Sequence, residues 1–187
     1  MCRTFKMLLV SVALLSGQLC MAQKFSVSTD VLGYADLCTF NVEGSYALSR
    51  HWSLVAGARY NPFTFRKGDP EKQFQNRQQS YSAGVRYWPW HIWSGWWFAT
   101  KLRYQEYNTG GILSRTTKEG DRLGGGIYGG YTHMLTPHLN IEFGVGLWGG
   151  YESETRYSCP LCGRLLTFEK GLFIRPDDIS ISLVYVF

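Results

Sequence analysis

The last nine residues of the chain, 179–187, read ISISLVYVF and alternate strictly between two faces of an extended strand. One face is apolar and comprises Ile179, Ile181, Leu183, Tyr185 and Phe187. The chain stays apolar up to its final residue, where a soluble domain would usually fray into a few polar residues. The pattern therefore predicts a terminal β-strand that is paired and lies against an apolar environment.

The composition favours a single β-rich domain. The 187 residues are 45% hydrophobic and 16% aromatic, and 21 of them are glycine. The formal charge is +5, and it falls to +3 (17 basic against 14 acidic residues) once the N-terminal segment with Arg3 and Lys6 is removed. This charge is small and spread along the chain, which argues against a nucleic-acid partner.

The N-terminus has the layout of a secretory signal peptide. Arg3 and Lys6 precede an apolar run at 7–15, which is too short to span a bilayer as a helix. Small residues follow at 20–22, so we expect residues 1–22 to be removed by cleavage before Gln23.

The remainder, 23–187, is expected to form one exported domain. Acylation of Cys20 is the alternative, but Leu19 stands where a lipoprotein signal has a small residue. No later stretch approaches the roughly 18 consecutive apolar residues of a transmembrane helix.

The alternation seen at the C-terminus recurs along the exported domain. The eight expected strands are 25–31, 40–48, 52–61, 81–88, 96–105, 123–132, 139–148 and 179–187. Eight strands of about ten residues are the smallest usual transmembrane β-barrel. A soluble β-sandwich has the same period and is the alternative fold.

The connections favour the barrel, because their lengths alternate. Long links at 61–79, 106–122 and 151–177 alternate with short ones at 49–51, 89–95 and 135–138. The predicted fold is an all-β, eight-stranded antiparallel up-and-down transmembrane β-barrel with short periplasmic turns and longer extracellular loops. Its expected location is the outer membrane of a Gram-negative bacterium.

Aromatic residues gather at the strand ends on the short-turn side, as in an interfacial girdle. The expected girdle comprises Trp52, Tyr87, Trp90, Trp93, Trp96, Tyr185 and Phe187. Phe187 and Tyr185 are also expected to form the C-terminal signal that the barrel-insertion machinery reads.

The opposite face of the strands carries charges that the barrel would enclose. The expected interior charges are Asp30, Glu43, Arg59, Arg86, Lys101, Arg103 and Glu142. An eight-stranded barrel has room only for side chains, so these groups are expected to pair and fix the register. A path for protons or ions is the alternative.

Three cysteines remain after signal cleavage, namely Cys38, Cys159 and Cys162. The sequence CPLCG at 159–163 has the spacing of half a zinc knuckle, and Cys38 is a candidate third ligand. Exported cysteines more often form disulfides, so no cofactor is expected and zinc is the alternative.

The sequence shows no catalytic constellation. His51, His91, His133 and His138 all fall at or beside the short turns, away from the rim where an outer-leaflet hydrolase would need its base. The glycines at 124–130 open no helix, so a nucleotide-binding loop is not indicated. We therefore expect a protein that is not an enzyme.

Five segments together resemble a known protein family over essentially the whole exported domain. They are LSRHWSLVAGARYNPF (48–63), AGVRYWPW (83–90), GGGIYGGYTHMLTPHLNIEFGVGLWGGY (124–151), YSCPLCG (157–163) and ISISLVYVF (179–187). The family is a domain of unknown function found in small outer-membrane proteins of Bacteroides-type bacteria. Its genes often neighbour those of fimbrial subunits, and the resemblance supplies no catalytic residues. One departure is Arg175-Pro176-Asp177, where relatives tend to have Gly-Pro-Thr.

The expected function is recognition at the cell surface or a part in fimbria biogenesis, carried by the long loops on a rigid barrel. The segment 152–175 is the first candidate. The expected partners are outer-membrane lipid, the insertion machinery and fimbrial or other envelope proteins. The alternatives are a lipid-modifying enzyme of the outer membrane and a soluble exported binding sandwich. The sequence names neither ligand nor oligomeric state.

Overall fold

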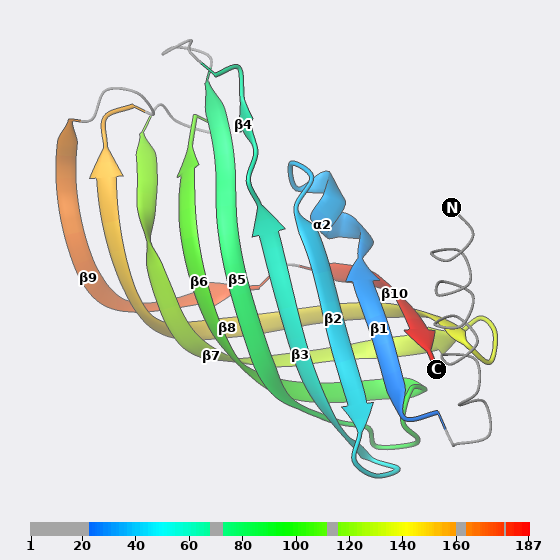
Figure 1. Cartoon of the computed structure of the whole chain (residues 1–187). Coiled ribbons are helices and arrows are strands. Elements are labelled where there is room, and N and C mark those ends of the chain that lie inside the picture. Colours follow the sequence, from blue (N-terminus) through cyan, green and yellow to red (C-terminus); the bar gives the residue numbers. More distant parts are fainter. Residues whose placement is uncertain (1–22, 68–72, 112–115, 160–163, 178) are drawn as a thin grey trace, which may run out of the picture.

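The protein is a closed, eight-stranded antiparallel β-barrel, seen in a computed structural model that describes residues 23–67, 73–111, 116–159, 164–177 and 179–187 (Figure 1). The elements are β1 (Phe25–Asp30), α2 (Val31–Ala35), β2 (Phe40–Ala47), β3 (Trp52–Asn61), β4 (Thr64–Phe65), β5 (Phe74–Tyr87), β6 (Gly95–Gly110), β7 (Thr117–Met134), β8 (Leu139–Tyr157), β9 (Leu165–Pro176) and β10 (Ser180–Val186). The all-β barrel predicted from the alternation is therefore confirmed. None of the helices in these ranges is long and apolar enough to cross a bilayer.

Ten strand segments make eight barrel strands because two of them continue others. β4 follows β3 and pairs with the same neighbour, β5. β9 and β10 pair with β8 one after the other, and the ladder passes from Leu147–Pro176 to Gly144–Ser180. The last barrel strand is thus broken near Asp177, whose N–H still donates to the Gly146 carbonyl at 2.8 Å.

The barrel closes between its first and last strands. β10 pairs with β1 from Ser26–Val186 to Asp30–Ser182, and the Phe187 N–H donates to the Phe25 carbonyl at 2.8 Å. Above Asp30 the closure ends, and among the described residues β9 pairs with β8 alone. Figure 1 shows β9 and α2 at opposite sides of this upper half.

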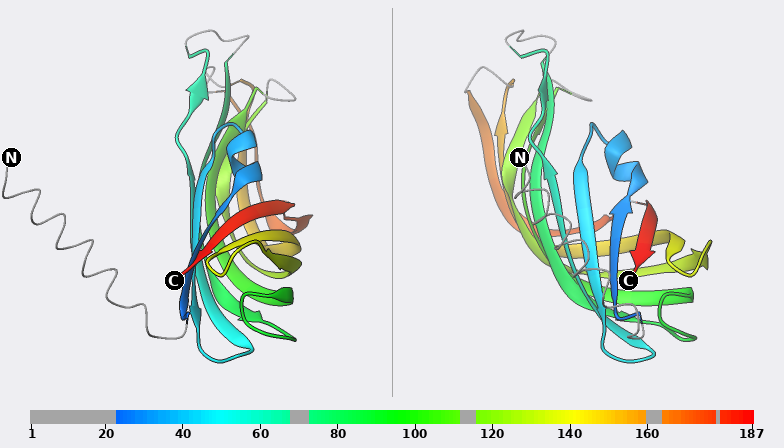
Figure 2. Two further views of the ribbon diagram at one scale, coloured as in Figure 1. Left: turned by 90° about the vertical axis from the view of Figure 1, so that its right-hand side faces the viewer. Right: turned by 45° about the vertical axis from the view of Figure 1, so that its right-hand side comes forward.

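Two of the long loops predicted from the sequence are not loops in the structure. Residues 106–122 and 151–177 are mostly strand, because β6, β7, β8 and β9 continue well beyond the apolar alternation. The backbone ladder persists where the outward side chains become polar, as in the pair Glu106–Asp121. In Figure 2 these strands and β5 rise above α2.

The first expected strand also ends early, because Val31 begins α2 instead of continuing β1. Asp30 is the N-cap, and its carboxylate accepts the Leu32 N–H at 3.1 Å. Leu37 and Cys38 then adopt positive φ angles of 49° and 61°, which turn the chain into β2.

The outer surface carries a band of exposed apolar side chains. Representative members are Val42, Leu54, Val85, Leu102, Ile127, Val145, Leu147, Leu172, Ile174 and Leu183. Exposed aromatic residues lie below this band at Phe25, Tyr46, Trp52, Tyr87, Trp96, Tyr131, Tyr185 and Phe187, and above it at Tyr60, Tyr81, Tyr104 and Tyr151. Beyond the upper aromatic residues, many outward positions are polar, for example Gln79, Glu106, Asp121 and Lys170, while Phe168 on β9 is an exposed apolar one.

Trp93 was expected in the lower girdle, and this is wrong, because its side chain is only 4% exposed. It packs inside the lower end of the barrel with Trp88 and Trp97, next to Val184 and Val186 of β10. The indole N–H of Trp93 donates to the Gln23 carbonyl at 3.3 Å. The chain reverses at 88–94 and folds this ring inward, which the strand period does not encode.

Candidate functional site

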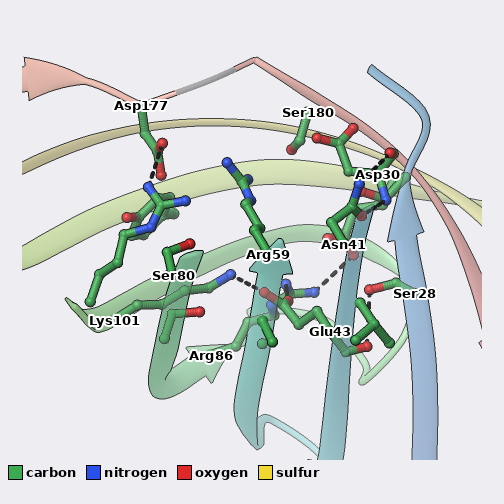
Figure 3. A pocket seen from close by; sticks show the side chains of 18 of the residues that line it. Ser28, Asp30, Asn41, Glu43, Arg59, Ser80, Arg86, Lys101, Asp177 and Ser180 are labelled. Atoms are coloured by element: carbon green, nitrogen blue, oxygen red, sulfur yellow. Dashed lines mark hydrogen bonds and ion pairs between the residues drawn. The ribbon is translucent and has the colours of Figure 1, made fainter. Parts of the chain in front are cut away.

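The interior charges meet in the middle of the barrel. Asp30, Glu43, Arg59, Arg86, Lys101, Arg103 and Glu142 all line one small cavity of about 80 Å³, together with Asp177 (Figure 3). They come from six different strands, and the alternation places each of them on the inner face. The lumen at this level is filled by side chains.

Arg86 is the centre of this network and is 4% exposed. Its Nη1 lies 2.8 Å from Oε2 of Glu142, and its Nη2 lies 2.7 Å from Oε1 of Glu43. Lys101 donates to the other oxygen of Glu43, and Thr132 donates to Glu142 at 3.0 Å. Two carboxylates and two cations thereby offset one another across the barrel.

Aromatic rings below the network close the lumen. The guanidinium of Arg86 lies 4.1 Å from the ring centroid of Trp97, and Trp88 and Trp93 meet edge to face at 5.7 Å. The Trp88 indole N–H donates to the Ser53 hydroxyl at 3.2 Å. Within the described residues, charge pairing and packed indoles thus occupy the lower half of the barrel.

Two predicted interior charges have other neighbours. Asp30 accepts the backbone N–H groups of Leu32 and Ile181, both at 3.1 Å. Arg103 binds Asp177 at 2.7 Å, a residue at the β9–β10 break that was not among the expected interior charges. Asp177 lies outside the alternating segment 179–187, so the period gave no indication of it.

A second charged cluster lies higher in the barrel, in segments that we expected to be loops. We call it the upper basic cluster, comprising Lys118, Arg122, Arg156, Arg175, Glu152 and Glu154. Glu154 contacts Lys118 at 3.3 Å and Arg156 at 2.7 Å, and Glu152 contacts Arg122 at 2.9 Å and Arg175 at 3.1 Å. Recognising β7 and β8 as longer strands would have placed these charges on the inner face.

Glu154 is the most strongly perturbed carboxyl in this cluster. Burial raises its pKa, but hydrogen bonds from Arg156, Tyr107 and Lys118 favour the ionised form and together lower the pKa to about 2. The Tyr107 hydroxyl donates to Glu154 at 2.9 Å. The Glu154 side chain is therefore ionised at neutral pH.

Two hollows of opposite polarity can be distinguished here, and the polar one adjoins the upper basic cluster. Inside the barrel, a polar cavity of about 270 Å³ is lined by Lys118, Arg122, Arg175 and other polar residues. On the outer face, an apolar groove of about 860 Å³ is lined by residues of β3, β5, β6, β7, β8 and the start of the last strand segment. Pro176 and Asp177 line both.

The three cysteines that are candidate metal ligands do not share one chemical state. Cys159 is disulfide-bonded, Cys38 carries an exposed free thiol, and Cys162 falls outside the described residues. A disulfide sulfur is not the thiolate that binds zinc. Among the described side chains, no group of three His, Cys, Asp or Glu residues is arranged to hold a metal ion.

The histidines lie at the lower end, and two of them bind backbone. Nδ1 of His51 donates to the Trp88 carbonyl at 2.9 Å, and Nδ1 of His138 donates to the Val186 carbonyl at 3.0 Å. These contacts fix the turns against the neighbouring strand ends. In each ring the contact uses the Nδ1 proton, so in the neutral imidazole Nε2 carries the lone pair.

The expected insertion residues are exposed at the closing edge of the barrel. The rings of Tyr185 and Phe187 lie 4.9 Å apart, and Phe187 also contacts Phe25 at 5.9 Å. Both side chains project outward.

One protein family matches this chain. The model of a family described as protein of unknown function (DUF3575) covers residues 5–187. No curated protein and no solved structure matches.

Proposed function

The chain belongs to the DUF3575 family of proteins of unknown function, and we propose that it is an outer-membrane β-barrel that binds a partner at the cell surface and is not an enzyme. The observation that carries this proposal is the outer face. Its apolar band is bordered by aromatic rings at both ends, as a barrel in a bilayer requires, while the charges lie inside.

The orientation follows from the connections. Both described chain ends and the tight turns at 48–51 and 135–138 lie at the lower end, which is the periplasmic end in barrels of this class. The upper ends of β5, β6, β7 and β8 extend past the aromatic border and present polar outward side chains. These extensions are the surface that we assign to recognition.

For the partner we propose a fimbrial or another envelope protein, the class that the family resemblance suggests. The barrel-insertion machinery is a second partner, at Tyr185 and Phe187. The paired lumen charges and the indole packing at the lower end favour a structural role for the interior over an ion path.

Location and topology are tested with single cysteines in a Cys38→Ser background. A cysteine at Ser153 should react with an impermeant maleimide on intact cells, and one at Ser49 only after the outer membrane is opened. The protein should fractionate with the outer membrane, and its electrophoretic mobility should shift on boiling. A soluble periplasmic protein without this shift would refute the location.

Recognition is tested in a strain that lacks the chain. Surface appendages and adhesion should be restored by the wild type but not by the triple variant Glu106→Ala, Glu119→Ala, Asp121→Ala, whose side chains are exposed above the band. Ser49→Ala with Arg50→Ala, at the lower turn, is the control and should restore fully. Full restoration by the triple variant would remove this surface from the proposal.

A further inference from the structure

The inner polar cavity and the outer apolar groove meet at one point of the barrel wall. Pro176 and Asp177 line both hollows, at the break between β9 and β10. The regular ladder on β8 is interrupted there, between the pairs Leu147–Pro176 and Gly144–Ser180. A polar hollow and an apolar hollow thus share Pro176 and Asp177 beside this interruption of the ladder.

The polar cavity has a cationic wall. Its charged lining comprises Arg59, Arg103, Lys118, Arg122 and Arg175 against Asp36 and Asp177. Glu152 and Glu154 lie behind this wall, and each is shared by at least two cations. Lys118 and Arg175 keep 42% and 41% of their side chains exposed, so both have donors available to a ligand.

The outer groove is apolar and lies in the exposed band. Its walls are side chains such as Trp52, Phe98, Ile127, Leu147 and Ile179. Gly129 contributes to its lining from the outward face of β7. A Cβ added at this glycine would approach no atom closer than 3.6 Å, so it would make only ordinary van der Waals contacts, with the Phe98 ring and the Trp97 carbonyl.

From this arrangement we infer that the barrel binds an anionic membrane lipid, with its phosphate headgroup in the polar cavity and an acyl chain in the outer groove. The cavity, about 270 Å³, is close to the lower end of small-molecule pockets, about 300 Å³, and therefore suits a headgroup rather than a whole lipid. Arginine and lysine bind phosphate through charge-assisted hydrogen bonds, and the groove removes the acyl chain from contact with polar groups. The inference rests on the proposed outer-membrane location.

The test measures bound lipid by native mass spectrometry on the full exported barrel in detergent. Phosphatidylglycerol is the anionic probe, phosphatidylcholine with the same acyl chains is the zwitterionic probe, and glycerol 3-phosphate is the soluble headgroup. We expect phosphatidylglycerol to bind at least about tenfold more tightly than the other two, because the choline cation of phosphatidylcholine would be repelled by the cationic wall and glycerol 3-phosphate has no acyl chain for the groove.

Two variants address the site, one for each half. Lys118→Gln with Arg175→Gln removes cavity cations, and Gly129→Leu fills the groove; each should weaken phosphatidylglycerol binding about tenfold or more. Their matched controls are Lys170→Gln, on the outward face of β9, and Gly125→Leu, on the same face of β7 outside the groove. Both controls should bind as the wild type does.

Equal binding of phosphatidylcholine, or equal losses in the control variants, would overturn the inference. Binding of glycerol 3-phosphate as tight as that of phosphatidylglycerol would assign the cavity to soluble phosphates and would refute the proposal that the ligand is a lipid. The boiling shift verifies that each variant is folded. Cell fractionation tests the proposed outer-membrane location, and the binding measurements in detergent test lipid selectivity, so the two proposals can fail separately.

Discussion

The carboxylate of Asp30 accepts the backbone N–H of Ile181 at 3.1 Å, across the seam where the first and last strands meet. The same oxygen accepts the Leu32 N–H and so caps α2. Asp30 therefore stands at the height where β1 leaves the sheet and the closed wall ends. One side chain both terminates the pairing of β1 with β10 and begins the helix.

Replacement of Asp30 by alanine should destabilise the barrel by about 1–2 kcal/mol, because it removes the helix cap and leaves the Ile181 N–H without its acceptor. Asp30→Asn keeps an acceptor oxygen and should cost much less. Urea unfolding in phospholipid vesicles, followed by tryptophan fluorescence, measures both. Equal losses for the two variants would contradict a hydrogen-bonding role.

Arg86→Met should be the most costly single change in the lumen, at about 3–5 kcal/mol, since it leaves Glu43 and Glu142 buried without their shared cation. Arg50→Met, at an exposed lower turn, is the control and should stay within about 0.5 kcal/mol. The same unfolding measurement compares them. A loss below about 1 kcal/mol for Arg86→Met would show that the network is dispensable for stability.

Gly84→Ala should destabilise the barrel by about 1–3 kcal/mol, because the new methyl group would collide with the Thr100 carbonyl and lie 2.7 Å from the Cα of Lys101. Gly171→Ala meets no atom within 4 Å and should be neutral within about 0.5 kcal/mol or slightly stabilising. The temperature of the boiling shift ranks the two variants. Similar boiling-shift temperatures for the two variants would mean that moving β5 away from β6 costs the barrel no stability.

Glu154 lies in the part of β8 above the apolar band and gives the barrel an acid-sensitive contact. Its pKa in the folded protein, about 2, is below the ordinary glutamate value of 4.5, so its contribution to stability is complete above pH 5 and disappears as the pH falls from 4.5 towards 2. Wild type should therefore lose more stability between pH 7 and pH 3 than Glu154→Gln. Unfolding curves at the two pH values measure the difference, and parallel losses would contradict it.

The strand period was enough to predict the fold and the inner face of the barrel. Side chains as distant in the chain as Glu43 and Glu142 line one cavity because each occupies an inward position of an alternating segment. The strand register that brings both carboxylates to Arg86 could not be predicted from the sequence, since neighbouring strands can slide by two residues without exchanging faces.

The rest depended on features that hydrophobic alternation does not report. The upper parts of β7 and β8 carry polar residues on both faces, so the hydrophobic period predicts loops at Arg122 and Glu152. The direction of the Trp93 side chain is set by a reversal of the chain and not by an alternating position in a strand. Asp177 occupies an interruption in the last strand, where backbone pairing and not side-chain pattern decides its direction.

The chain ends of the barrel lie side by side, since Phe187 donates its N–H to the Phe25 carbonyl. A short linker would therefore join them, and new ends could be opened at one of the upper connections, giving a circular permutant with every strand pair retained. Such a molecule would separate the strand pairing that Phe187 makes from the insertion signal that we propose for it. It would close the barrel as before when refolded in detergent, yet in cells it would reach the membrane without a terminal aromatic residue for the insertion machinery to read.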